Sequence, residues 1–161
     1  MEEFAVLQTL ARYVRAADHR DGAAMAALFL PEGRVIMAQN QAGTAAPVAT
    51  LEGREAIAYA VANLLQPHPP HGWSHHTTHD PIVAVDGDRA TIDAQLIVFN
   101  SLGTPEPAGG WPEGTVGLQG SVTPIESGYY RPELRRVGGR WLIETMTILL
   151  DQTIPMPKPA S

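Results

Sequence analysis

The sequence predicts a single α+β domain, with helices near its start and a strongly bent antiparallel sheet behind them. Apolar residues recur at helical spacing over residues 3–18 and 54–65. From about residue 74 onward they alternate with a period of two, as in strands that have one buried face. A bent sheet with helices on one side can wrap around a pocket, so the fold class also predicts a site for a small apolar molecule.

The first predicted helix, residues 3–18, carries an acid on its apolar side. At about 100° per residue, Asp18 falls on the same stripe as the apolar residues, with Tyr13 at the margin of that stripe beside Val6 and Ala17. A carboxylate on the buried side of a helix is costly unless another group pairs with it. Asp18 is therefore a candidate functional residue. The stripe itself is expected to consist of Phe4, Leu7, Leu10, Ala11 and Val14.

The next segment is expected to contain a short second helix and a hairpin. Asp21 is a candidate N-cap for a helix that runs through Phe29, with Pro31 and Gly33 ending it. Residues 34–38 follow as a strand, 40–46 as a loop and 48–51 as its hairpin partner. The third helix, 54–65, is expected to turn four apolar residues inward: Ile57, Val61, Leu64 and Leu65.

The remaining strands are joined largely by tight turns. Asp86-Gly87-Asp88 and Gly138-Gly139 are typical hairpin turns, and consecutive strands joined this way pair antiparallel. The expected strands cover 74–85, 89–101, 115–136 and 140–151, with bends at Gly120, Pro124 and Gly128.

Three further boundaries follow from composition. The segment 103–114, rich in Pro and Gly, is either a mobile lid or a plain hairpin loop. Residues 1–154 are expected to form one domain, and 155–161 a disordered tail.

Composition argues against several partners. With 161 residues, a net charge of -6 and no basic cluster longer than Arg135-Arg136, the chain is a poor match for nucleic acid. No apolar run approaches the roughly 20 residues that cross a bilayer. The chain has no cysteine and begins with acidic residues, which excludes thiolate chemistry and favours a cytoplasmic protein without a signal peptide.

Five of the six histidines lie between residues 68 and 79. In an extended segment His75 and His76 point to opposite faces, and His75 and His79 stand about 13 Å apart at about 3.3 Å per residue. That spacing disfavours a shared metal ion, and His68 in its Pro-rich loop is expected to be solvated. His76 shares a face with Thr78 and Ile82, so we predict that it points to the concave side of the sheet.

Asp18 and His76 can satisfy each other, since each is a polar group expected on a buried face. An Asp that holds a His in one tautomer forms the orienting half of an acid–base catalyst. Tyr13, on the same helix as Asp18, can donate a hydrogen bond to a carbonyl or a leaving oxygen. Each of the three also has a purely structural interpretation. No glycine-rich phosphate loop, dinucleotide fingerprint or nucleophile elbow occurs, so no cofactor and no metal is predicted.

Four segments, in order, resemble the SnoaL-like branch of the nuclear transport factor 2 (NTF2)-like superfamily. They are Leu10-Ala11-Arg12-Tyr13 through Asp18-His19-Arg20-Asp21 with Leu28-Phe29; Leu51 to Ile57; His75-His76 with Ile82 to Asp88; and Gly128-Tyr129-Tyr130 with Gly139-Arg140-Trp141. The resemblance implies a cone-shaped fold, in which a curved antiparallel sheet and about three N-terminal helices enclose a pocket.

The dehydratase-like members, similar to scytalone dehydratase and bile acid 7α-dehydratase, use a Tyr and an Asp on the first helix and a His on the sheet. Tyr13, Asp18 and His76 occupy the matching positions, although a shift by one residue would select His75. The resemblance thus implies a lyase or isomerase that needs no cofactor and acts on a small apolar oxygenated molecule.

Two other functions stay open. An epoxide hydrolase or polyketide cyclase could use a set such as Asp18, Asp93 and Arg34, and a non-catalytic binding or assembly protein needs no catalytic set. The strand around Thr91 to Phe99 carries apolar residues on both faces, so a homodimer or homotrimer is predicted.

Overall fold

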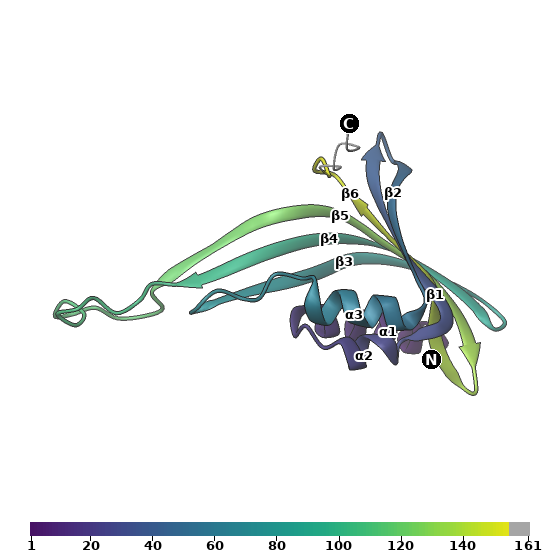
Figure 1. The fold of residues 1–161 in the computed structure, drawn as a ribbon, viewed down its shortest axis with the longest axis horizontal. Coiled ribbons are helices and arrows are strands. Elements are labelled where there is room, and N and C mark those ends of the chain that lie inside the picture. The colour runs from purple at the N-terminus through teal and green to yellow at the C-terminus, as the bar shows by residue number, and fades with distance from the viewer. Residues whose placement is uncertain (155–161) are drawn as a thin grey trace.

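The structure is a computed structural model in which residues 1–154 are described; the predicted tail, 155–161, lies outside the described residues. It is an α+β fold in which helices pack on one side of a six-stranded curved sheet (Figure 1). The elements in chain order are α1 (Glu2–Asp18), α2 (Gly22–Ala26), β1 (Phe29–Gln41), β2 (Thr44–Glu52), α3 (Arg54–Asn63), β3 (Gly72–Asp86), β4 (Arg89–Gly103), β5 (Gly120–Val137) and β6 (Arg140–Leu150).

The sheet has the strand order β2-β1-β6-β5-β4-β3. Its neighbours pair antiparallel except β1 and β6, which are parallel. The expectation of a wholly antiparallel sheet is therefore wrong at this one seam. The turns joining β3 to β4 and β5 to β6 are the predicted hairpins, whereas β1 is far from β6 in sequence and no turn constrains its direction.

The segment after α1 differs from the prediction. Asp21 caps α2 by accepting a hydrogen bond from the Ala24 N–H (2.9 Å), as expected. The helix ends at Ala26 instead of reaching Phe29, and Phe29 begins β1. Because β1 and β2 pair up to a turn at residues 42–43, most of the predicted loop at 40–46 is strand.

The buried side of α1 is shifted from the predicted stripe. Phe4 is 67% exposed and Ala11 is exposed, whereas Val6, Tyr13 and Ala17, predicted at the margin, are buried. The first turn of α1 is instead held at the sheet through Glu2, which accepts hydrogen bonds from Trp141 and Arg136. Asp18 lies on the buried side, as predicted.

The strands β4 and β5 continue past the helices as a long arm, which leads to the 104–119 connection at the far left of Figure 1. No residue of that connection is among the described residues that line the cavity between the helices and the inner face of the sheet. The segment therefore has the form of a plain hairpin loop, and the structure gives no support to a lid.

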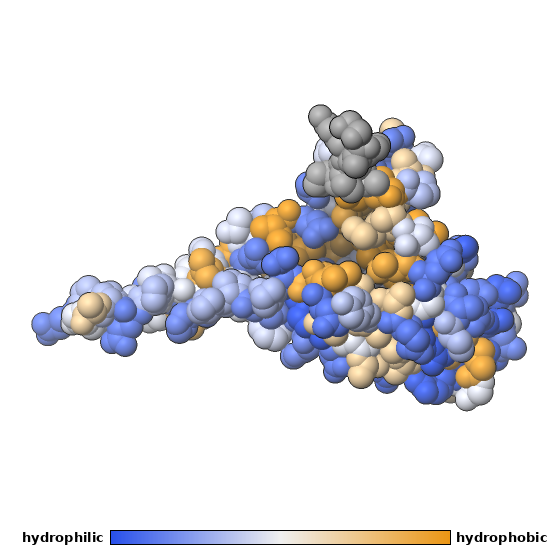
Figure 2. All heavy atoms as spheres, viewed as in Figure 1, coloured by the Kyte–Doolittle hydropathy of each residue, from blue (hydrophilic) through white to orange (hydrophobic). Residues whose placement is uncertain are grey.

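The core lies between the helices and the inner face of the sheet, and its largest fully buried side chains include Phe29, Met25, Ile57 and Leu96. Figure 2 shows apolar residues gathered where the helices face the curved sheet. The outer side of β4 carries half-buried Ile97 and Phe99, and a dimer or trimer through this side stays a prediction. No helix in the described part of the chain is long and apolar enough to cross a membrane.

Gly128 is the glycine that the curvature of the sheet requires most clearly. Its φ is +157°, and a Cβ at this position would lie 1.9 Å from the Leu149 carbonyl oxygen on β6. Only a residue without a side chain lets β5 approach β6 this closely.

Candidate functional site

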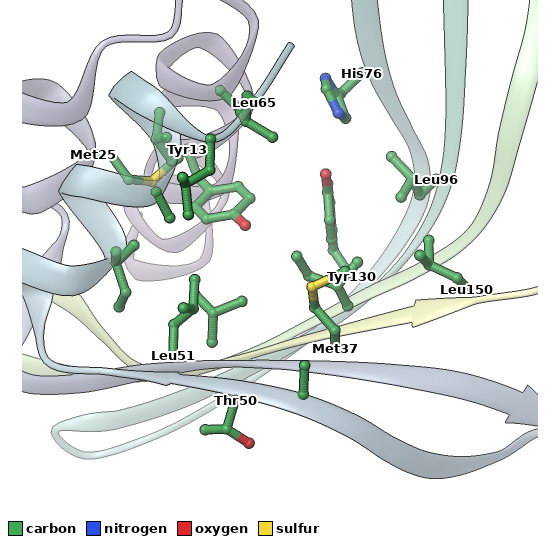
Figure 3. Close-up of a pocket in the computed structure, with 18 of the residues that line it drawn as sticks. Tyr13, Met25, Met37, Thr50, Leu51, Leu65, His76, Leu96, Tyr130 and Leu150 are labelled. Atoms are coloured by element: carbon green, nitrogen blue, oxygen red, sulfur yellow. The ribbon is translucent and has the colours of Figure 1, made fainter. Parts of the chain in front are cut away.

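A cavity of about 360 Å³ lies between the helices and the inner face of the sheet. Its volume is within the range of small-molecule sites, roughly 300–1,000 Å³. Most of its lining is apolar, and Figure 3 shows the side chains that surround it. The residues that can form hydrogen bonds in it are Tyr13, Thr50, His76, Glu126 and Tyr130.

Asp18 and His76 are in contact at the edge of this cavity. The Asp18 Oδ1 lies 2.6 Å from the His76 Nδ1 and also accepts a 3.0 Å hydrogen bond from the His76 backbone N–H. The Asp18 side chain is 6% exposed and that of His76 is 17% exposed. An ionised carboxylate only accepts hydrogen bonds, so the His76 Nδ1 must carry the proton. The Nε2 of a neutral His76 is then unprotonated.

The backbone just after Asp18 is fixed by an unusual turn. Arg20 has a φ of +57°, a left-handed conformation that costs a non-glycine residue about 1–2 kcal/mol. Its guanidinium donates to the Ala17 carbonyl (2.8 Å), the Gln66 carbonyl (3.2 Å) and the Ser74 hydroxyl (3.3 Å). These bonds offset that cost and tie the end of α1 to the start of β3.

His68 supports Asp18 from the connector between α3 and β3. Its Nδ1 accepts a hydrogen bond from the Ser74 N–H (3.2 Å), so its Nε2 carries the proton and donates to the Asp18 carbonyl (2.8 Å). Its ring stacks on Trp73, with 4.1 Å between ring centres. The expectation that His68 is solvated is therefore wrong, because the connector folds back over the end of α1.

Two buried tyrosines point their hydroxyl groups into the cavity (Figure 3). Tyr13 and Tyr130 meet edge to face, with 5.4 Å between ring centres. Burial raises the pKa of Tyr13. Burial is also the main cause of the raised pKa of Tyr130, to which Tyr13, Glu126 and Asp18 add. Both phenols are therefore neutral hydrogen-bond donors at ordinary pH, and no described residue hydrogen-bonds to either hydroxyl.

The structure thus brings His76 and Tyr13 to one cavity, with Asp18 bound to His76 beside it and His75 exposed on the opposite face of β3. The prediction that Ile82 shares the face of His76 is wrong. Ile82 is 74% exposed and lies on the other face of β3. The pairing of β3 with β4 shifts between His79 and Ile82, so the alternation changes phase there.

Sequence reasoning missed Tyr130 and Glu126, both on β5. The sequence signals were the Tyr129-Tyr130 pair and an acid in a strand, but they did not show which side chain turns inward.

The hydrolase set does not assemble. Asp93 pairs with Arg131 (3.1 Å), and Arg34 donates to the Thr145 hydroxyl (3.2 Å). Neither Asp93 nor Arg34 lines the cavity that His76 lines. Within residues 1–154, no group of three or more His, Asp or Glu side chains is placed to hold a metal ion.

The fold of this chain is similar to that of several solved structures. It resembles an NTF2-like protein with a cystatin-like fold from Novosphingobium aromaticivorans (24% identity, TM-score 0.62, covering 92% of this chain and 80% of that one). It also resembles a proposed scytalone dehydratase from the same organism (16% identity, TM-score 0.64, covering 99% and 91%). A third similar structure is the beta subunit of a proposed aromatic-ring-hydroxylating dioxygenase, again from that organism (16%, TM-score 0.68, covering 95% and 91%).

The SnoaL-like domain model matches residues 2–147, nearly the whole chain, and the chain belongs to this family. The resemblance seen in the four sequence segments is thereby confirmed. No curated protein matches the chain. The similar structures share the fold, while their names range from a dehydratase to a hydroxylase subunit, so fold alone does not select a reaction.

Proposed function

We propose that this protein is a lyase or isomerase that needs no cofactor and acts on a small, largely apolar, oxygenated molecule. The observation that supports this is the 2.6 Å contact between Asp18 and His76 at the edge of the cavity. Asp18 fixes the tautomer in which Nδ1 is protonated, which leaves Nε2 available as a general base. His76 lines a mostly apolar cavity, where a substrate can approach it away from bulk water.

In the proposed reaction the His76 Nε2 takes a proton from a carbon next to a carbonyl group. Asp18 stabilises the imidazolium that results, and a neutral phenol, Tyr13 with Tyr130 beside it, donates a hydrogen bond to the carbonyl oxygen as charge develops there. In an elimination, the neighbouring C–O bond then breaks, a C=C bond forms, and His76 returns the proton to the departing hydroxyl as water. In an isomerisation, the proton returns to a different carbon.

The first test compares His76→Ala with His75→Ala. The substrates are a panel of cyclic ketones that carry a hydroxyl group β to the carbonyl, and loss of water is followed by the absorbance of the conjugated ketone. We expect His76→Ala to lower turnover by about 10²–10⁴-fold, the usual worth of a positioned base. His75 is exposed on the other face of the strand, so His75→Ala should retain the wild-type rate.

Near-normal turnover in His76→Ala would exclude His76 as the base. Binding of the ketones without any conversion by the wild-type protein would favour a non-catalytic binding or assembly protein.

A further inference from the structure

Glu126 is an acidic residue that lines the cavity and has no role in the proton transfer proposed above. It is half-buried on β5. In the described part of the chain no side chain donates a hydrogen bond to its carboxylate, and no arginine forms an ion pair with it. No Arg or Lys is among the described residues that line the cavity, so nothing there neutralises the charge of Glu126.

The register of the sheet places Glu126 in the same row as His76. His76 on β3 pairs with Val98 on β4, and Val98 pairs with Glu126 on β5. Residues directly opposite each other in neighbouring strands point to the same face, and Val98 is buried in the core on the inner face. Because strands lie about 4.8 Å apart, the backbones at His76 and Glu126 are separated by about 10 Å.

The backbone around Glu126 is held in place on both sides. Pairing with β4 skips Ile125, since Val98 pairs with Glu126 and Phe99 with Pro124; such a bulge re-aims the neighbouring side chains. On the other side Ser127 is fixed to the segment after β6: its N–H donates to Gln152 (2.9 Å) and its hydroxyl donates to Asp151 (2.8 Å).

The Glu126 carboxylate also affects one hydrogen-bond donor of the cavity, the phenol of Tyr130. Among the charges that raise the pKa of Tyr130, beyond burial and Tyr13, are those of Glu126 and Asp18. The inner face of the sheet thus carries the Asp18–His76 pair at one end of the row and the Glu126 carboxylate at the other, and the neutral phenols of Tyr13 and Tyr130 line the same cavity. A carboxylate accepts hydrogen bonds only, and a fixed negative charge with no cation nearby repels an anion.

We propose that Glu126 binds a hydroxyl group of the substrate at the opposite end of the molecule from the carbon that loses its proton. The substrate is then a neutral molecule that carries a ketone near His76 and a second, distal hydroxyl group, and a carboxylated analogue is rejected. A hydroxyl fits better than an ammonium group, because most of the cavity lining is apolar and a full charge is costly to desolvate there. This inference rests on the proposed function, since it assigns the two ends of the same substrate.

The test uses three probes with one skeleton: phenylcyclohexanone, its para-hydroxy derivative and its para-carboxy derivative. Their dissociation constants are measured by calorimetry with the wild-type protein, Glu126→Gln, Glu126→Leu and the control Glu133→Gln, which changes an exposed acid on the same strand. A hydrogen bond to a carboxylate is worth at least about tenfold in affinity. We therefore expect the wild-type protein to bind the hydroxy probe at least about tenfold tighter than the parent, and the carboxy probe most weakly.

In Glu126→Gln the carboxy probe should gain affinity, because the negative charge is gone while the shape is kept. In Glu126→Leu the preference for the hydroxy probe should disappear, and Glu133→Gln should match the wild type. Unchanged preferences in both Glu126 variants, or equal binding of the three probes to the wild type, would overturn the role of Glu126 and leave the proposed function standing. Failure of every probe to bind the wild type would count against both proposals.

Discussion

Replacing Asp18 by Ala tests the contact on which the proposed chemistry depends. The change removes the acceptor of two hydrogen bonds, from the His76 Nδ1–H and from the His76 backbone N–H. Hydrogen bonds to charged groups contribute about 1.5–3 kcal/mol each, and the two here share one oxygen atom. Since His76 can recover part of the loss from water in the cavity, we expect Asp18→Ala to lower the free energy of unfolding by about 2–4 kcal/mol.

The comparison variants are Asp18→Asn and Asp21→Ala. The amide oxygen of Asp18→Asn still accepts from the His76 backbone, so its loss should be smaller than that of Asp18→Ala. Asp21 caps α2 in an exposed position, and its removal should cost about 1 kcal/mol without affecting His76. Urea unfolding measures these differences, provided that the dependence on urea concentration is the same for all variants.

Nitrogen NMR of the imidazole rings supplies the second measurement. In the wild-type protein and in Asp21→Ala, His76 should show the tautomer in which Nδ1 is protonated. In Asp18→Ala it should show a mixture of the two tautomers. A loss of stability in Asp18→Ala smaller than that in Asp21→Ala, with an unchanged His76 tautomer, would refute the assignment of Asp18 as the partner that orients His76.

Two further predictions concern the sheet and the tyrosines. Gly128→Ala should lower the free energy of unfolding by more than about 2 kcal/mol, because the new Cβ would overlap the Leu149 carbonyl. Gly87 also has a left-handed backbone, but no atom lies near the place of its Cβ, so Gly87→Ala should lower the free energy of unfolding by only about 1–2 kcal/mol. Thermal unfolding of both variants measures the difference. Tyr13 and Tyr130 should keep their protons above pH 10, where tyrosines of the unfolded chain lose theirs. The folded state then binds more protons than the unfolded state, so the free energy of unfolding should fall as pH rises above 10. In a pH titration the folded protein should show less phenolate absorbance than four ionised tyrosines would give, until it unfolds.

Asp18 could be predicted from the sequence because its signal is local. A carboxylate at the end of an apolar helical stripe is anomalous whatever the helix packs against, so the expectation of burial needed no tertiary information. The exact stripe was harder to predict. Phe4 continues the helical pattern, but the buried side of α1 runs along Val6, Tyr13 and Ala17. The apolar pattern of a helix does not specify which edge of its apolar side will be buried against the rest of the fold.

The facing of residues on β3 depended on an irregularity of the sheet, whereas that of residues on β5 depended on which of two alternating faces turns inward. His76 points inward although Ile82, six residues later, points outward, because one shift of register reverses the alternation between them. Such a bulge is determined by pairing with the neighbouring strand, so the alternation within β3 itself could not have located it. On β5 the inward face runs in unbroken alternation from Leu134 through Tyr130 to Glu126, and the skipped residue Ile125 ends that register.

The Asp18–His76 pair is positioned by backbone geometry, whereas the rest of the cavity is shaped by side chains. The cavity lining can therefore be changed by substitution without moving the pair. Asp18 is fixed by backbone geometry: the left-handed turn at Arg20 and the hydrogen bond from His68 to its carbonyl hold the end of α1 against β3. The lining away from this end consists of side chains such as Met37 and Leu65, which make no hydrogen bond to the pair. Substitutions there should alter the volume and polarity of the cavity while leaving the contact between Asp18 and His76 intact. The proposed substrate preference can therefore be changed at positions such as Glu126 without disturbing the Asp18–His76 contact on which the proposed function rests.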